Sequence, residues 1–432
     1  MKTMLAALAA SVALASAAAP EKVGDLQLAD KDALVAAAAK LGDMAGFPML
    51  GAMAAQSLAN PPEELAKASG KNRVALVADV TSTNSVEDIL MAAEPTYETA
   101  PALPAGVVFR ITVNEKGMAL YSKAMKMAGK ELNELSESLN GAFNAYLKMA
   151  ESIKAFELSG AIGDAGLEFR FAFDAVPGGE AERLMGKSFS TRNPFDGFGP
   201  ETLIASAVGA GNCGDVMKCW KKLLEVAEKN GISTKWISAA GSNGKSRFVL
   251  DLDAAATWVK SQKDSGTCPD LEKLATDLAE VCACASCQTG EAPEQAVSFE
   301  IKGMKADASP SARIARTLPE ASRPGVSQMG VFSFYGIGKS VLARLCEMEC
   351  CKDRLAQAKT MLPTLPPDAG CDIAYALWAE KGDGSRFAGV MRVTPAEVKG
   401  LFAAGSICVT SCLGNSAGGG APVPVTFDDD DD

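Results

Sequence analysis

The sequence predicts an α+β protein with mostly antiparallel sheets, built from hairpin–helix and strand–helix units whose helices pack on one sheet face. Three predicted hairpins support this fold class, at residues 156–174, 236–253 and 371–393. Each hairpin has glycine-containing turn residues at its tip and runs directly into a helical segment. Single strand–helix units lie between the hairpins, so we predict two related halves without the fixed period of a solenoid.

Residues 1–17 have the three parts of a secretory signal peptide in order. Lys2 is followed by an apolar stretch from Leu5 to Leu14, and then by the small-residue cleavage pattern Ala15-Ser16-Ala17. The apolar stretch is shorter than the ~20 residues that a membrane-spanning helix needs. We therefore expect an exported, periplasmic or extracellular protein with no integral membrane span after cleavage.

Residues 18–69 are alanine-rich and predict an N-terminal helical segment. Within it, residues 41–59 combine Gly46, Gly51 and Ala55 with a proline at position 48. Asp43 and this proline favour a packed helix pair, and a membrane-seeking helix is the alternative.

A first α+β domain is predicted over residues 70–290. Strands at 72–80 and 106–113 are each followed by a helical stretch. In the hairpin at 156–174, alternation places Phe169, Phe171 and Phe173 on one face of the second strand. In the hairpin at 236–253, Asn243-Gly244 predicts a tight two-residue turn.

A second α+β domain is predicted over residues 291–413, after the polar, turn-like stretch 288–296. Its hairpin turns at Asp383-Gly384 and leads into Thr394-Pro395-Ala396-Glu397, the pattern of a capping box at a helix start. Residues 414–432 form a Gly/Pro-rich linker followed by Asp428 to Asp432, which predicts a flexible acidic tail of unassigned role.

The absence of histidine restricts the chemistry most. It excludes serine or cysteine nucleophiles activated by histidine, and zinc sites with histidine ligands. A formal net charge of −11 also argues against binding to nucleic acid. We identify no catalytic residue, no cofactor site and no convergent carboxylate pair, so the chain is more simply explained as a non-enzymatic protein.

Two Gly-Lys-Ser tripeptides resemble part of a phosphate-binding loop. The motif needs a glycine five positions before the first of these residues, and the chain has Ala239 and Ser333 there. Gly338-Lys339-Ser340 follows a strand and opens a helix, so it is the closer of the two, but the missing glycine argues against a nucleotide site.

The twelve cysteines fall into groups of two, four, four and two along the chain. Even local groups in an exported protein favour short-range disulfides, whose pairing within the groups of four stays open. The disulfide candidates are Cys213 and Cys219; Cys268, Cys282, Cys284 and Cys287; Cys346, Cys350, Cys351 and Cys371; Cys408 and Cys412.

The second group has two alternative interpretations. Cys268, Cys282, Cys284 and Cys287 are weak candidates for a four-thiolate zinc site, but only one cysteine lies in the first arm. Cys284 and Cys287 also form a C-x-x-C pair, but it follows a predicted helix instead of opening one, which is unfavourable for a redox dithiol.

We therefore predict an exported binding or structural protein stabilised by local disulfides. The first alternative is a carrier of an amphiphilic or other small ligand in a groove under the hairpin sheets, lined by side chains such as Phe169, Phe171 and Phe173. The second alternative is a thiol-redox or metal-binding protein that uses residues 282–287. The partner is then an unknown protein or a small amphiphile.

Overall fold

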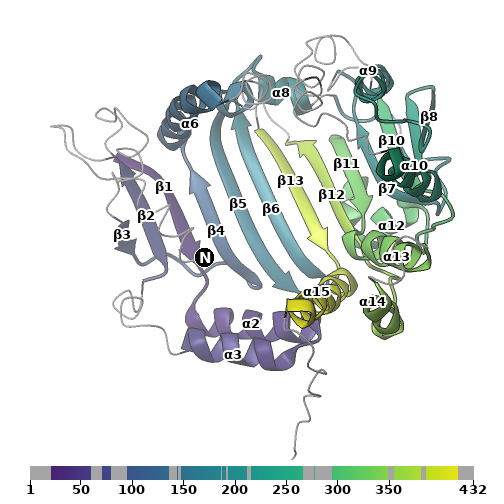
Figure 1. Ribbon diagram of the computed structural model, residues 1–432. Coiled ribbons are helices and arrows are strands. Elements are labelled where there is room, and N and C mark those ends of the chain that lie inside the picture. The colour runs from purple at the N-terminus through teal and green to yellow at the C-terminus, as the bar shows by residue number, and fades with distance from the viewer. Residues whose placement is uncertain are drawn as a thin grey trace, which may run out of the picture.

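The computed structural model describes residues 21–59, 71–78, 95–135, 144, 147–185, 187–190, 193–211, 216–265, 277, 294–348, 355–380 and 386–416. The predicted signal peptide, the acidic tail, the C-x-x-C pair and the turn at Asp383-Gly384 therefore lie outside the described residues. Within them, the chain folds around one large sheet with helices, which confirms the α+β class (Figure 1).

The described residues of the first part of the chain form six strands and four helices. They are β1 (Glu21–Leu28), α2 (Lys31–Ala45), α3 (Pro48–Ala59), β2 (Arg73–Ala78), β3 (Pro95–Glu98), β4 (Val107–Val113), α6 (Glu115–Leu135), β5 (Ile153–Gly163), β6 (Gly166–Ala175) and α8 (Glu180–Met185).

The described residues of the second part form seven strands, with helices between and after them. They are β7 (Thr202–Val208), α9 (Val216–Lys229), β8 (Ile237–Ser242), β9 (Lys245–Leu250), α10 (Leu252–Ser265), β10 (Gln295–Ile301), α12 (Pro310–Thr317), the 3₁₀ turn η2 (Pro319–Ser322), β11 (Val326–Phe332), α13 (Phe334–Glu347), α14 (Ala356–Met361), η3 (Leu362–Thr364), β12 (Ile373–Ala379), β13 (Arg386–Val393) and α15 (Pro395–Ser416).

All thirteen strands belong to one sheet in the order β3-β2-β1-β4-β5-β6-β13-β12-β11-β7-β10-β9-β8. Neighbours are antiparallel except β10 and β9, which run parallel. The sheet is continuous across the predicted boundary at 290/291, because β6 pairs with β13 and β7 lies between β11 and β10. Strands from the two predicted domains therefore interleave.

Local turn chemistry accounts for the hairpins. Asn243 and Gly244 both have positive φ, at 50° and 75°, as the predicted two-residue turn requires. Gly163 and Gly166 pair across the turn that joins β5 to β6, and Gly166 has a φ of 115°. A Cβ at Gly166 would also lie 1.9 Å from the carbonyl oxygen of Val393, so only glycine fits there.

The strand β1 corrects the prediction that residues 18–69 are all helical. In Glu21–Leu28, Leu26 and Leu28 point to one face and Asp25 and Gln27 to the other, which is the alternation of a strand. The helical segment begins only after Asp30, whose side chain accepts a hydrogen bond from the amide of Ala33 at 2.8 Å. The alanine-rich composition of the segment obscured this short strand.

The predicted helix pair is present as α2 and α3. The first helix ends at Gly46, which adopts the left-handed conformation with a φ of 78° and donates to the carbonyl of Asp43. The helices then approach closely where Gly42 meets Gly51: a Cβ on Gly42 would lie 2.4 Å from the Cα of Gly51. The small residues of this segment therefore serve helix packing.

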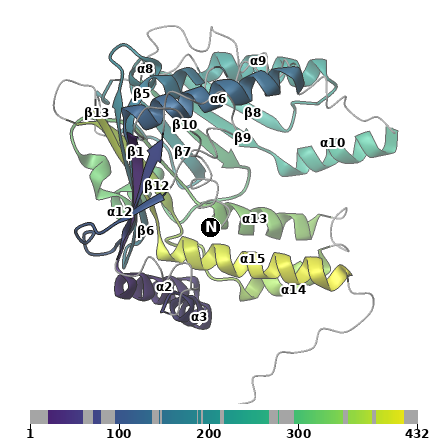
Figure 2. The same cartoon turned by 90° about the vertical axis from the view of Figure 1, so that its left-hand side faces the viewer.

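The sheet has two different faces. The helix face carries α2, α8, α9 and α15, whose side chains pack on Phe173, Phe387, Met391 and their neighbours. The reverse face carries α12 and η2 over the half of the sheet around β11 and β12, where the largest core cluster lies. Figure 2 shows the sheet nearly edge-on, with most helices on one side of it. The prediction that helices cover one face is therefore correct for most helices, and α12 and η2 are the exception.

Candidate functional site

A band of apolar side chains crosses the helix face over six neighbouring strands. Strand register aligns it in two rows, which we call the apolar band. The first row is Leu26, Ile111, Leu158, Phe171, Gly389 and Leu377, and the second is Leu28, Phe109, Gly160, Phe169, Met391 and Tyr375. Its members come from β1, β4, β5, β6, β13 and β12, so residues distant in sequence form one surface.

Every side chain of the apolar band is partly exposed, and none is charged; Leu377 and Met391, at its β12–β13 end, also contact the clusters under the helices. The rows on either side of it are covered: Phe387 and Ala175 pack under α8, and Val393 and Ile373 pack under α2 and α15. In Figures 1 and 2 these helices lie at opposite ends of the strands. The apolar band therefore lies between two groups of helices that stand on the same face.

Glycines make room for three aromatic rings of the apolar band. A Cβ on Gly160 would lie 2.2 Å from the Phe109 ring, and a Cβ on Gly389 would lie 2.4 Å from the Phe171 ring. Gly330 of β11 has the same relation to the ring of Tyr375, at 2.5 Å. Each of these three rings thus occupies the space that a side chain at the glycine of the adjacent strand would fill.

The reverse face of β1, β4, β5 and β6 is polar, whereas that of β13 and β12 belongs to the core cluster under α12 and η2. Asp25, Thr112 and Glu157 are aligned across β1, β4 and β5, opposite to the apolar side chains. Glu157 forms ion pairs with Arg110 at 2.6 Å and Arg386 at 3.8 Å. Glu168 is held between Arg170 and Arg392; burial raises its pKa, but the two guanidinium groups bring it below its usual value overall. This half of the sheet is therefore amphipathic.

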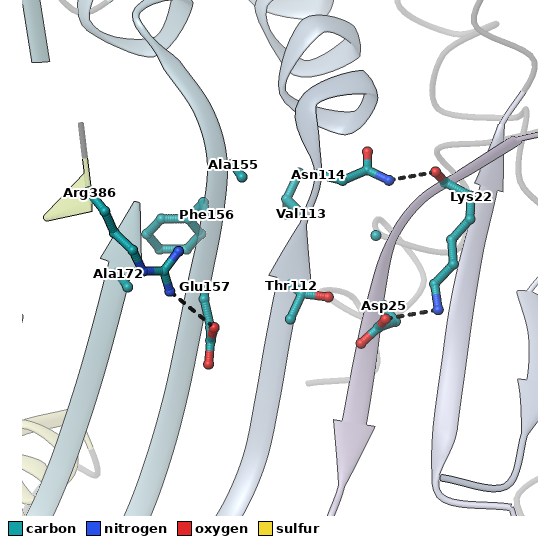
Figure 3. A pocket seen from close by; sticks show the side chains of 11 residues that line it. Lys22, Asp25, Thr112, Val113, Asn114, Ala155, Phe156, Glu157, Ala172 and Arg386 are labelled. Carbon is teal, nitrogen blue, oxygen red and sulfur yellow. Dashed lines mark hydrogen bonds and ion pairs between the residues drawn. The ribbon is translucent and has the colours of Figure 1, made fainter. Parts of the chain in front are cut away.

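An open pocket of about 270 Å³ lies on this polar face (Figure 3). Lys22 pairs with Asp25 at 2.9 Å on one side of it, and Arg386 pairs with Glu157 on the other. The amide of Asn114 donates to the carbonyl of Lys22 at 2.7 Å. Both carboxylates in the wall are thus paired with cations, so the pocket does not present a carboxyl group poised for acid–base chemistry.

Two buried carboxylates lie where the helices meet the sheet. Asp372, at 0% exposure, accepts from Arg313 at 2.6 Å and from Arg316 at 2.6 Å. Arg313 also donates to the carbonyls of Thr202 and Leu203, which ties α12 to β7 and β12. The cluster is internally satisfied, and it is a structural connection between three elements.

Glu397, the second buried carboxylate, lies at the N-terminus of α13. It accepts from the hydroxyl of Ser333 at 2.7 Å and from the backbone amide of Tyr335 at 2.9 Å. Burial raises its pKa above the usual range in spite of these hydrogen bonds. The predicted capping box of α15 is thus only half formed: Thr394 accepts from the amide of Glu397 at 3.3 Å, but the glutamate side chain caps α13.

The contacts at the start of α13 also bear on the second Gly-Lys-Ser tripeptide, Gly338-Lys339-Ser340, as a phosphate-binding site. The amides at this helix start, where a phosphate would bind, are occupied by the chain's own carboxylate. Lys339 instead donates to the carbonyl of Pro366 at 2.7 Å. These contacts leave the tripeptide in a structural role.

Other carboxylates of the described residues are paired with cations. Arg344 joins Asp253 of α10 to Glu347 of α13. Asp251 binds Lys302 at 2.8 Å, and this hydrogen bond is the main cause of its lowered pKa. No group of three or more metal-ligating side chains occurs in the described part of the chain.

Cys346 and Cys371 are buried free thiols, and the described residues contain no disulfide bond. The thiol of Cys346 contacts the carbonyl of Leu355, and that of Cys371 contacts the carbonyl of Pro367, each at 3.8 Å. Burial raises the pKa of Cys371 to about 12, so this thiol is unreactive at neutral pH. The structure therefore does not join either of these two candidates to another cysteine.

Disulfide bonds between the other ten cysteines stay predictions. Cys219 lies in α9, and Cys408 and Cys412 lie in α15, one helical turn apart. The zinc and dithiol candidates Cys268, Cys282, Cys284 and Cys287 lie outside the described residues, as do Cys213, Cys350 and Cys351.

The sequence suggested three phenylalanines as the lining of a ligand surface, and only two of them lie on the apolar band. Phe169 and Phe171 belong to the apolar band, whereas Phe173 packs against Phe387 with ring centroids 5.4 Å apart. Sequence reasoning missed the contributions of β1, β4 and β12. Side chains in each of these strands point alternately to the two faces of the sheet. The alignment of the strands, however, depends on pairings between segments that are distant in sequence.

Comparison of the chain with models of known protein families, with curated protein sequences and with solved structures finds no match. Among the described helices, none is both long enough and apolar enough to cross a bilayer.

Proposed function

We propose that the chain is an exported, non-enzymatic binding protein, and that the apolar band holds the apolar chain of an amphiphilic ligand. The supporting observation is that ten aligned side chains of the apolar band are all partly exposed and all uncharged. Apolar surface left in water is unfavourable by about 25 cal/mol per Å². A continuous, partly exposed apolar strip of this kind is typical of an interaction surface.

The shape of the apolar band favours an extended chain as the ligand. Six strands at a spacing of about 4.8 Å give it a length of roughly 24 Å, and it is two side-chain rows wide. The rings of Phe109 and Phe171 fill the space next to Gly160 and Gly389 along its floor. A long acyl chain can lie across such a surface, whereas a charged or bulky polar ligand would find no complementary group within it.

Two finer features of the architecture belong to this proposal. The order strand–helix–hairpin–helix occurs at 107–185, at 202–265 and, with α14 and η3 added, at 326–416. The hairpins of the segments at 107–185 and 326–416 meet where β6 pairs with β13, from Leu167 opposite Val393 to Asp174 opposite Arg386. We propose that these segments are the diverged copies expected from the sequence. Export rests on residues 1–17, and pairing of the remaining ten cysteines is proposed from that compartment.

Binding of hexadecanoate, measured by isothermal titration calorimetry, tests the proposed function. Leu158→Gln places an amide in the centre of the apolar band, and Ser159→Gln places the same group on the opposite face of the same strand. We expect the first variant to weaken binding tenfold or more and the second to leave it within twofold. Thermal unfolding of both variants checks that they are folded.

The proposed function fails if the wild-type chain binds no hexadecanoate. It also fails if Leu158→Gln and Ser159→Gln, both folded, bind it equally well.

A further inference from the structure

The helix α3 exposes apolar side chains at one end of the molecule. Its sequence, PMLGAMAAQSLA, contains no charged residue. Only Gly51 and Ala55 are buried among the positions of α3 whose exposure is described, and Gly51 packs against α2. Met49 and Met53 are 63% and 57% exposed. A helix without charged residues is normally enclosed by other elements, but among the described elements only α2 packs extensively on this one.

The C-terminal helix extends the same surface. Phe402 of α15 is 46% exposed, and its ring centroid lies 6.5 Å from that of Phe47, in the turn that leads into α3. Residues 400–416 of α15 contain no charged residue. We call Met49, Met53 and Phe402 the apolar tip. Figures 1 and 2 both place α3 at the outer end of the molecule, below the sheet.

The charged residues of this region lie on α2 and at Lys399 of α15, whose stem lies near Gly46 in the turn before α3. Those of the helix pair are all on α2, at Lys31, Asp32, Lys40 and Asp43. One of them is already paired: Lys40 binds Asp164 in the turn between β5 and β6 at 2.5 Å. The helix pair as a whole is thus amphipathic, with α3 as its apolar outer side.

The width of the exposed surface of α3 distinguishes between a partner helix and a lipid phase as its cover. Pro48, Met49, Ala52, Met53, Ala54, Gln56 and Ser57 are all exposed. At 100° per residue these positions surround about two thirds of the helix circumference. A partner helix covers a stripe of roughly 100°. A lipid phase surrounds a helix more completely, so the arc fits partial immersion better than a contact with one protein.

We propose that the apolar tip docks the protein on a lipid bilayer, with α3 lying in the interfacial region. The chain carries a net charge of −11, so the surface that it meets is a neutral, zwitterionic one and not an anionic one. Docking involves no crossing of the bilayer, because α3 has only 12 residues. The inference rests on α3 and α15 and does not depend on the apolar band.

Flotation of the full chain with phosphatidylcholine vesicles tests docking. We expect the wild-type chain to float with the vesicles and Met49→Glu/Met53→Glu to lower its partition coefficient tenfold or more. Val259→Glu on α10 is the matched control, because Val259 is also 57% exposed. This control should stay within twofold of the wild-type value, and circular dichroism should show that all three chains are folded.

A second readout does not depend on loss of binding. Met53→Trp should shift its fluorescence to shorter wavelength when phosphatidylcholine vesicles are added, whereas Val259→Trp should not.

The proposal is overturned if the wild-type chain does not float, or if the glutamate variants at positions 49 and 53 float as well as the wild type. It is also overturned if light scattering shows a wild-type dimer that Met49→Glu/Met53→Glu dissociates, since a second copy would then cover α3. Hexadecanoate binding by the same variant separates this outcome from failure of the proposed function.

Discussion

At the scale of single residues, the buried ion pair between Arg313 and Asp372 is the most consequential interaction. Both side chains are almost inaccessible, at 1% and 0% exposure. A buried charge that loses its partner is far less stable than a pair of exposed charges that separates, because water cannot replace the lost interaction. The pair links α12 to the start of β12 and, through two carbonyls, to β7.

Asp372→Ala should therefore lower the free energy of unfolding by about 3–5 kcal/mol. The control is Arg110→Ala, which breaks an exposed pair with Glu157 and should cost no more than about 1 kcal/mol. Urea denaturation followed by circular dichroism measures both values. Equal losses in the two variants would contradict a structural role for the buried pair.

Glu397 gives stability a specific dependence on pH. Burial raises the pKa of Glu397 in the folded chain above its usual value of 4.5. Between 4.5 and the folded pKa, the folded chain retains a proton that the unfolded chain releases, so rising pH favours unfolding. The contribution of this group to stability is thus complete below pH 4.5 and is lost as pH rises through the folded pKa.

The variant Glu397→Gln isolates the pH dependence that Glu397 causes, because the wild type and the variant share all other titrating groups. The unfolding free energy of the wild type minus that of the variant should decrease as pH rises from about 4.5, and then level off. Denaturant titrations at a series of pH values measure this difference. A difference that is constant or that increases with pH would show that burial does not govern this carboxyl group.

At the scale of elements, the hairpins could be predicted and the helix caps only in part. The turn at Asn243-Gly244 depends on two adjacent residues, so the sequence contains all the necessary information. The capping box at Thr394 to Glu397 was half right, because a tertiary contact with α13 replaced the local one for the glutamate side chain. The strand β1 was missed because it is a short element beside an alanine-rich helix.

A glycine next to an aromatic ring and a glycine in open space should respond differently to substitution by alanine. Gly389→Ala in β13 places a methyl group within 3.0 Å of three atoms of the Phe171 ring, so it should destabilise by about 1–3 kcal/mol. Gly338→Ala in α13 meets no atom within 4 Å and should stabilise by about 0.4–1 kcal/mol. Melting temperatures of the two variants should therefore move in opposite directions. A shift in the same direction would contradict the packing of the ring next to the glycine.

At the scale of the whole molecule, the sequence predicted the fold class but not the single sheet. The strand β7 pairs with β10 and β11, and β6 pairs with β13 across more than 200 positions of sequence. Such pairings have no local signature, because each strand carries only its own alternation. The apolar band could not be predicted for the same reason: Leu26, Leu158 and Leu377 become neighbours of one surface only after six strands have aligned.

The central claim is that an amphiphile lies along the apolar band, and covalent labelling tests it most directly. A hexadecanoate analogue with a photoreactive diazirine on its chain would be bound to the full protein, irradiated and mapped by peptide mass spectrometry. We expect labels at helix-face residues of β4, β5 and β6, such as Ile111, Leu158 and Phe171, and competition by unlabelled hexadecanoate. Labels that fall instead around Asp25, Thr112 and Glu157 on the reverse face, or that resist competition, would contradict it.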